Sequence, residues 1–368
     1  MENYMDYIDW RGDITFDMCP FTEIDGLIFS QLAYIEFDER LVPEAGDEEE
    51  MTLRNLGKAY FNGKVNGENF VPGSDELLKA MIKCDRFKNI GVMSYVSEFD
   101  AEKTEQFGAI TVRISDGTYV VAFRGTDATI SGWEEDFKLC YMCPVVSQTR
   151  SAEYLRKVMN KLDGTFYLVG HSKGGNLAVY SSMEQKKSNI KRIRAIYNYD
   201  GPGFLQDIVD SEKYKNIMPK VQSFMPQSSI VGTIMYHNED FTIIQSDKRG
   251  IAQHNAINWQ MRGKSFKTLD KFQNASIIFS EANKAWINEI DRKRRAEFID
   301  IVFRILKAGS DTVTGFSEDF PKVMNNMLRS FNNLDRDTKR MIRTTVRQMI
   351  LLYSKTVTTS LRGRIKNE

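Results

Sequence analysis

The sequence has few of the residues that mark secreted, metal-binding or membrane-spanning proteins. Its 368 residues include only four cysteines and three histidines. No uncharged apolar run reaches the roughly 18 residues that a membrane-spanning helix needs. The amino-terminal residues carry acidic side chains and no apolar core, so they do not resemble a secretory signal. We therefore expect a soluble protein located in the cytoplasm.

The charge composition excludes a strong electrostatic attraction to nucleic acid. Fifty basic residues balance fifty acidic ones, and we expect no nucleic-acid partner. The balance conceals an asymmetry, because residues 265–368 contain 20 Lys and Arg against 12 Asp and Glu. The segment is therefore basic, and the rest of the chain is acidic.

Cofactor and metal motifs are also missing. No dinucleotide fingerprint, phosphate-binding loop or metal-ligand spacing occurs, so we expect no cofactor and no metal. Cys140 and Cys143 have the spacing of a metal or redox pair, but no second pair accompanies them. We interpret them as reduced core thiols.

The most informative segment spans residues 165–182. An apolar run, 166–169, is typical of a buried parallel strand, and helical spacing begins directly after Gly174. Between them lies Gly170-His-Ser-Lys-Gly174, which has the Gly-x-Ser-x-Gly pattern of a nucleophile elbow. Such a turn holds the Ser172 hydroxyl where a base can take its proton. The sequence therefore predicts a nucleophilic serine.

Strands and helices alternate around this motif. This order predicts a mainly parallel sheet with helices on both faces, an α/β-hydrolase-like fold. From residue 265 onward we expect no strands, only helices, which divides the chain into a hydrolase domain, 1–264, and a helical C-terminal segment, 265–368. The predicted strands are 108–114, 118–123, 166–169, 193–199, 221–225 and 240–245, and the main predicted helices are 22–37, 74–83 and 151–163.

The helical C-terminal segment has two interpretations. It is either a cap that folds back on the hydrolase domain or a surface that contacts a protein or an anionic membrane. Basic residues at 292–295 and on the last helix motivate the second interpretation.

A serine nucleophile needs a base, an orienting acid and donors to an oxyanion. His171 directly precedes Ser172, so we expect its side chain to lie behind the elbow. His237 begins the last predicted strand, at the edge opposite the expected site. His254 follows that strand, in the chain order of hydrolase triads, and is the expected base. Oxyanion donors are expected from the backbone N–H of Lys173 and from the Gly125-Thr126 turn.

Further motifs indicate a family. Phe123-Arg-Gly-Thr126, followed by Trp133 and Asp136, resembles the pattern of class 3, fungal-type lipases. The elbow, Asp-Gly-Pro-Gly-Phe at 200–204 and Gln-His at 253–254 more closely resemble a bacterial branch of α/β-hydrolases related to those lipases. The resemblance covers roughly residues 20–260.

The resemblance implies Ser172 as nucleophile, His254 as base, and Thr126 and Lys173 as oxyanion donors. It also implies that Trp133 lies on a lid, although the helix expected at 131–139 could equally be packed in place. The acid departs from the lipase pattern, because Ser229 stands where those lipases have aspartate.

Two carboxylates are candidates for the acid. Asp200 ends the strand beside the elbow strand, and Asp247 lies near the carboxyl end of the last predicted strand. Asp200 is the preferred candidate, and Asp247 is the alternative.

These features predict a serine hydrolase that cleaves a small-molecule or lipid-like carboxylic ester through a Ser172 acyl-enzyme. A thioesterase or acyltransferase would use the same elbow with another leaving group or acceptor. Ser229 at the acid position motivates a third alternative, a degenerate hydrolase fold that acts as a binding protein. Acyl length and oligomeric state do not follow from the sequence.

Overall fold

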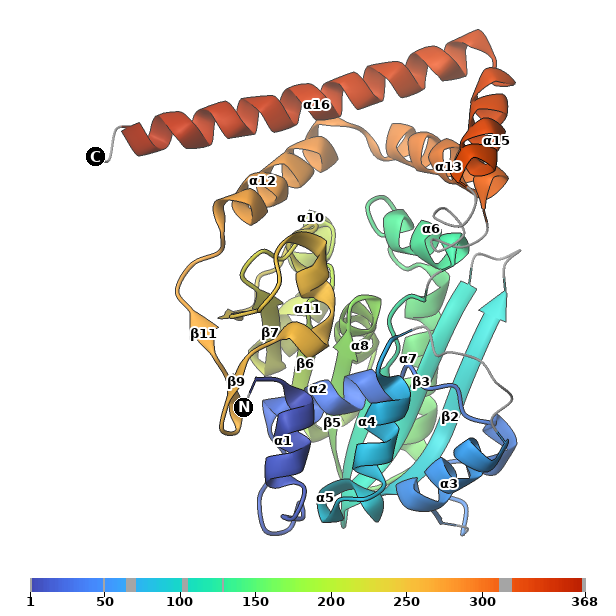
Figure 1. Ribbon diagram of the computed structural model, residues 1–368, viewed down its shortest axis with the longest axis vertical. Helices are drawn as coiled ribbons and strands as arrows, with labels where there is room; N and C mark the ends of the chain where they lie inside the picture. The colour runs from blue at the N-terminus through green and yellow to red at the C-terminus, as the bar shows by residue number, and fades with distance from the viewer. Residues whose placement is uncertain are drawn as a thin grey trace.

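A central twisted sheet organises the chain. A computed structural model describes residues 2–48, 50–63, 71–100, 105–127, 129–310 and 320–365. Among these residues, nine strands form one sheet in the order β1-β2-β3-β4-β5-β6-β7-β8-β11 (Figure 1). The strands are β1 (Met51–Thr52), β2 (Gly91–Asp100), β3 (Glu105–Ser115), β4 (Thr118–Phe123), β5 (Thr165–His171), β6 (Ile193–Tyr199), β7 (Val221–Pro226), β8 (Phe241–Ile244) and β11 (Thr268–Leu269).

The centre of the sheet is parallel, and its flanks are antiparallel. Strands β4 to β8 pair in parallel, whereas the pairings from β1 to β4 and between β8 and β11 are antiparallel. The predicted α/β-hydrolase-like fold with a mainly parallel central sheet is therefore confirmed. Its parallel part runs from β4 to β8.

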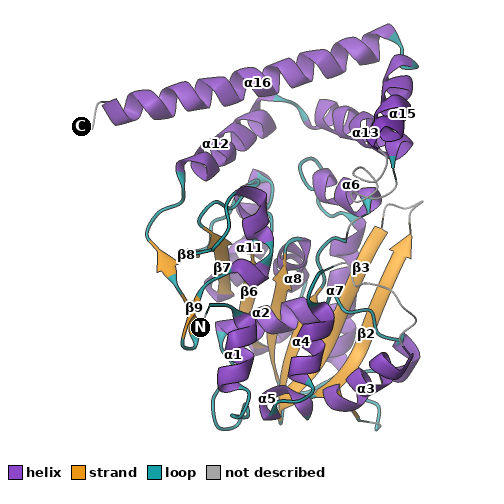
Figure 2. Cartoon of the chain, viewed as in Figure 1, coloured by secondary structure: helices purple, strands orange, loops and turns teal. Residues whose placement is uncertain are grey.

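Each face of the sheet buries its own apolar core. Along β4, Val120 and Ala122 belong to one core, whereas Val121 and Phe123 belong to the other, as the alternation of side chains in a strand requires. Helices α1 (Tyr4–Arg11), α2 (Glu23–Leu32) and α4 (Ser74–Met81) cover the first face, and α7 (Val146–Lys161), α8 (Lys173–Met183) and α11 (Glu212–Ile217) cover the second (Figure 2). The other helices before the C-terminal segment are α3 (Leu53–Gly63), α5 (Asp85–Lys88), α6 (Ile130–Lys138), α9 (Lys187–Arg192) and α10 (Gln206–Val209).

Three sequence predictions need correction. The helix expected over 22–37 ends at Leu32. Strand β2 was not predicted, because Ser94, with a φ of 49°, lies where its register with β3 shifts and its alternation breaks. Strands also continue past residue 265, since β10 (Ser265–Phe266) pairs with β9 (Met261–Arg262) and β11 joins the main sheet.

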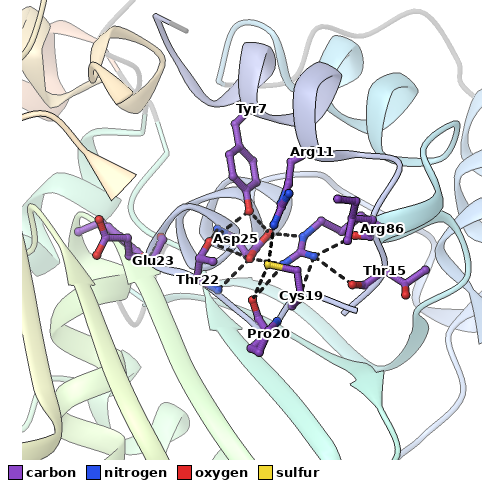
Figure 3. A network of polar contacts seen from close by, with 11 residues as sticks. Tyr7, Arg11, Thr15, Cys19, Pro20, Thr22, Glu23, Asp25 and Arg86 are labelled. Atoms are coloured by element: carbon purple, nitrogen blue, oxygen red, sulfur yellow. Dashed lines mark hydrogen bonds and ion pairs between the residues drawn. The ribbon is translucent and has the colours of Figure 1, made fainter. Parts of the chain in front are cut away.

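A buried ion pair holds the helices of the first face together. Thr22 caps α2, and its capping-box partner Asp25 also accepts two hydrogen bonds from Arg86, at 2.7 Å from Nε and 2.6 Å from Nη2. Tyr7 of α1 donates to the same carboxylate (Figure 3). Both charged side chains are fully buried. One carboxylate therefore joins α1, α2 and α5.

The C-terminal helices lie across one end of this sheet. They are α12 (Asn274–Glu289), α13 (Arg292–Gly309), α15 (Phe320–Asn332) and α16 (Arg336–Ile365). The long helix α16 crosses above α12 and α13 (Figure 1) and packs on both. Among the described helices, none combines the length and apolar character needed to cross a bilayer.

Candidate active site

The predicted site residues gather at the carboxyl edge of the parallel strands. Thr126 follows β4, Ser172 follows β5 and Asp200 follows β6. Ser229 follows β7, and His254 lies in the loop after β8. Because these five strands are neighbours and run the same way, residues far apart in the sequence meet at one edge.

Ser172 stands in a strained turn between β5 and α8. Its φ is +58°, a conformation that non-glycine residues rarely adopt. The two flanking glycines allow the close approach, because a Cβ on Gly170 would lie 2.1 Å from the Gly174 carbonyl and one on Gly174 would lie 2.1 Å from the Phe123 carbonyl. The predicted strand, tight turn and helix are confirmed, and the hydroxyl lies at the edge of the sheet.

Asp200 and His254 are brought together. His254 Nδ1 lies 2.6 Å from Asp200 Oδ2, and the carboxylate is almost completely buried. A carboxylate at this distance requires a proton on Nδ1, which leaves Nε2 unprotonated in the neutral ring. His254 and Ser172 line the same cavity. Ser172 and His254 therefore share one cavity, and His254 is in contact with Asp200.

Ser229 supports Asp200 instead of replacing it. The Ser229 hydroxyl donates to Asp200 Oδ1 at 2.5 Å, and the backbone N–H of Gly232 donates to the same oxygen at 3.1 Å. The other candidate acid, Asp247, is exposed and accepts a hydrogen bond from Gln260. Of the two candidates, the histidine contacts Asp200. The sequence analysis did not predict that Ser229 would donate to Asp200. Its position after β7, at the edge where the site residues gather, could have indicated this role.

The His171 side chain is buried and bonded on both ring nitrogens. Its Nε2 lies 2.7 Å from the backbone oxygen of His254, and its Nδ1 lies 3.1 Å from the Tyr34 hydroxyl. Burial, followed by the charge of His254, lowers the pKa of His171 well below its usual range. A neutral His171 donates from Nε2 and fixes the backbone that carries His254.

The expected oxyanion turn packs against the elbow. A Cβ on Gly125 would lie 2.7 Å from the His171 carbonyl oxygen, so only glycine fits there. The Thr126 hydroxyl donates to Asp136, at 2.6 Å from Oδ2. The backbone N–H of Lys173 is the first of helix α8 and has no partner within that helix. Both predicted donor residues, Thr126 and Lys173, therefore border the cavity that contains Ser172.

The Lys173 side chain points into the protein. Its Nζ donates to Glu135 Oε2 at 2.8 Å and to the Gln106 carbonyl at 3.2 Å, and both charged side chains are buried. Burial lowers the pKa of Lys173, but Glu135 and Asp136 outweigh it and the pKa is raised. This ion pair fixes α6, which carries Glu135, to the residue that follows Ser172. Nothing in the sequence pattern indicated Glu135.

Asp136 is a third carboxylate at this edge. Burial raises its pKa to about 6, against the opposing effects of Lys173 and of the hydrogen bond from Thr126. Its side chain is one quarter exposed and lines the cavity.

A cavity of about 1030 Å³ lies over Ser172. Apolar side chains form most of its wall. Helix α6 contributes Trp133, the predicted lid residue, and Phe137. The C-terminal helices contribute Phe279, Ala282 and Trp286 from α12, Phe298 and Ile299 from α13, and Met349, Ile350 and Tyr353 from α16.

Hydrogen bonds and a ring contact connect the C-terminal helices to residues around the cavity. Such contacts are expected if these helices form a cap on the hydrolase domain. On α12, the Ser276 hydroxyl donates to the Ser229 carbonyl, and the Asn283 side chain accepts from the Met235 backbone at 3.0 Å. On α13, Phe303 contacts Phe137, with ring centroids 5.2 Å apart. These helices therefore complete the cavity, a contribution that sequence reasoning did not locate.

The cysteine pair and the third histidine lie outside this chemistry. Burial raises the pKa of both the Cys140 and Cys143 thiols to about 12, which keeps them protonated.

His237 pairs with Glu239, with 2.8 Å between His237 Nδ1 and Glu239 Oε1. Within the part of the chain that the structure describes, no group of three or more His, Cys, Asp or Glu is placed to hold a metal ion.

Comparison with known proteins identifies the family of this chain. No curated protein matches the chain. Solved structures similar to it include the crystal structure of M37 lipase, at 16% identity, covering 58% of this chain and 70% of that one, with a TM-score of 0.37. Residues 81–304 match the family described as Mbeg1-like. Because this match spans more than half of its length, the chain belongs to the Mbeg1-like family.

Proposed function

We propose that the protein is a serine hydrolase that cleaves carboxylic esters with an apolar acyl chain. The observation that carries the proposal is the 2.6 Å contact between His254 and Asp200 on a cavity that also contains Ser172. The Asp200 carboxylate in contact with His254 supports a catalytic site over the alternative of a degenerate hydrolase fold.

In this reaction, the Ser172 hydroxyl attacks the ester carbonyl carbon while His254 Nε2 takes its proton. The backbone N–H groups of Lys173 and Thr126 donate to the oxygen that becomes negative. Breakdown of the intermediate expels the alcohol, which receives the proton from His254 and leaves Ser172 acylated. A water molecule, deprotonated by His254, then releases the carboxylic acid and restores the enzyme.

The cavity supports an apolar acyl group. Each buried methylene contributes about 0.8 kcal/mol, so four additional methylenes raise kcat/KM by up to about 10²-fold if the chain occupies the apolar wall. A series of nitrophenyl esters from butyrate upward measures this slope. A flat series would show that the acyl chain does not enter the cavity.

Labelling with a fluorophosphonate probe tests the nucleophile and the base. We expect wild-type protein to label, Ser172→Ala not to label, and His254→Gln to label on the order of 10²- to 10⁴-fold more slowly. His237→Gln is the matched control, since His237 also pairs with a carboxylate but is not among the described cavity residues. Equal labelling of wild type and Ser172→Ala would refute the proposal.

A further inference from the structure

Helix α16 carries a basic stripe, which we define as Arg336, Lys339, Arg340, Arg343 and Arg347. Spacings of three and four residues place these side chains on one helix face. They border one shallow hollow together with Thr344, and the four arginines are exposed. The whole helix contains eight Lys and Arg and a single acid, Asp337. The solvent side of α16 is therefore strongly positive.

The stripe has no acidic partner within the described part of the chain. The Lys339 ammonium donates to the Asn332 carbonyl at 2.7 Å, and no ion pair involves the four arginines. On the neighbouring helix α13, by contrast, Arg292 pairs with Asp207 and Lys307 pairs with Glu134. Like charges at i and i+4 repel one another along a helix. An external anionic surface would relieve this repulsion.

Apolar side chains continue the same face. Ile350 and Leu351 follow Arg347 by three and four residues, and they are 60% and 57% exposed. Tyr353 is also half exposed. The opposite side of the helix is buried against the body of the protein at Ile342 and Thr345. Cations followed by exposed apolar groups are typical of a helix that lies in a membrane interface.

The apolar end of α16 also borders the cavity over Ser172. Met349, Ile350 and Tyr353 line that cavity although all three are substantially exposed. A surface that bound the stripe would therefore lie close to residues that line the proposed active-site cavity. A nucleic acid would satisfy the arginines but not the apolar groups, whereas an anionic bilayer offers phosphate headgroups to the former and acyl chains to the latter.

We propose that α16 docks the protein on an anionic phospholipid surface through the basic stripe, with Ile350 and Leu351 entering the interface. Docking in this orientation places the cavity-lining residues Met349, Ile350 and Tyr353 close to the bilayer. The docking does not depend on the hydrolase activity, so it is tested on the full-length Ser172→Ala protein, which cannot consume lipid.

Vesicle co-sedimentation tests the docking. We expect Ser172→Ala to bind vesicles of phosphatidylcholine with phosphatidylglycerol, and to bind vesicles of phosphatidylcholine alone at least tenfold more weakly. Raising NaCl from about 0.1 M to about 0.5 M should weaken the binding, because salt screens the headgroup charge. Equal binding to the two vesicle types would overturn the proposal.

Charge reversal locates the binding surface. Arg340→Glu, Arg343→Glu and Arg347→Glu together should weaken vesicle binding by about 100-fold, since each basic residue near an anionic surface contributes roughly fivefold. The matched control reverses Lys186, Lys187 and Lys191, which are exposed near α9 at the amino edge of the sheet. Equal losses in the two triple variants would show that net charge, not α16, causes binding.

Two further measurements keep the test decisive. The corresponding triple Arg→Gln variant keeps a neutral helix former at each position and should still lose at least tenfold. Circular dichroism and, in the wild-type Ser172 background, turnover of a soluble short-chain ester should be unchanged in both arginine variants. Tighter binding to a DNA duplex than to anionic vesicles would identify nucleic acid as the partner and overturn the proposal.

Discussion

Two buried aspartates, Asp25 and Asp200, each accept several hydrogen bonds and contact a basic side chain. The two clusters differ in the identity of that side chain and in its access to solvent. Asp25 faces Arg86, and both side chains are closed off from solvent (Figure 3). Asp200 faces His254, whose side chain is 22% exposed and lines a cavity. Arginine keeps its proton at every ordinary pH, whereas histidine gains and loses one near neutrality. The first cluster can therefore only stabilise the fold, and the second can move a proton.

The largest effect should follow removal of the Asp200 charge. In Asp200→Asn, the amide cannot hold the imidazolium of His254, and kcat should fall on the order of 10⁴-fold. The hydrogen bonds from Ser229 and Gly232 still have an acceptor, so the free energy of unfolding should change by less than about 2 kcal/mol. Ester turnover and urea unfolding measure the two quantities. A fully active Asp200→Asn would remove Asp200 from the mechanism.

The opposite pattern is expected for Asp25→Asn. This change leaves the Arg86 charge buried without its partner, which costs about 3 to 5 kcal/mol of unfolding free energy. The turnover number of the protein that stays folded should be unchanged. Asp38→Asn is the control, because the Asp38 pair with Arg40 lies at the surface and should contribute nothing measurable. Lost turnover at full stability would contradict the distinction between the two clusters.

Asp136 should show an intermediate, pH-dependent effect. Its folded pKa of about 6 lies above the ordinary aspartate value of 3.8, so the folded state holds the proton more tightly than the unfolded state. This contribution to stability is present below about pH 4 and is lost as the pH rises through about 6. Relative to wild type, Asp136→Asn should therefore gain up to about 3 kcal/mol between those pH values. Parallel stability curves for the two proteins would show that Asp136 ionises normally.

The smallest effect should follow the loss of the Ser229 hydroxyl. Ser229→Ala removes one donor from the Asp200 carboxylate, worth about 1 kcal/mol, and kcat should fall roughly five- to tenfold with KM unchanged. Ser228→Ala is the matched control, since the neighbouring hydroxyl donates to Gln273 instead. Equal effects of the two changes would mean that Ser229 acts through the loop rather than through Asp200.

Patterns among neighbouring residues were sufficient to predict the elbow and several strands. The elbow around Ser172 was predictable because a buried strand, a glycine-flanked turn and a helix are all encoded within 18 residues. Strands β4 and β6 were predicted at their observed bounds for the same reason. Strand β2 was missed because an irregularity at Ser94 interrupts its pattern.

Contacts between distant residues were not predictable in this way. The sequence favoured Asp200 over Asp247, but both lie near the end of a strand and no local pattern shows which of them contacts His254. Only the parallel order of β5, β6 and β7 places Asp200 between the elbow and Ser229, while Asp247 turns toward Gln260. The same holds for α16, whose apolar residues reach the cavity across almost 180 positions of the chain from Ser172.

By itself, the sequence determined a strained serine turn, a histidine in hydrolase order and a basic helical end, because each depends on neighbours along the chain. The tertiary structure alone decided which carboxylate orients His254 and which helices enclose the cavity. These properties depend on strand order and on packing between distant elements, and no local pattern records either.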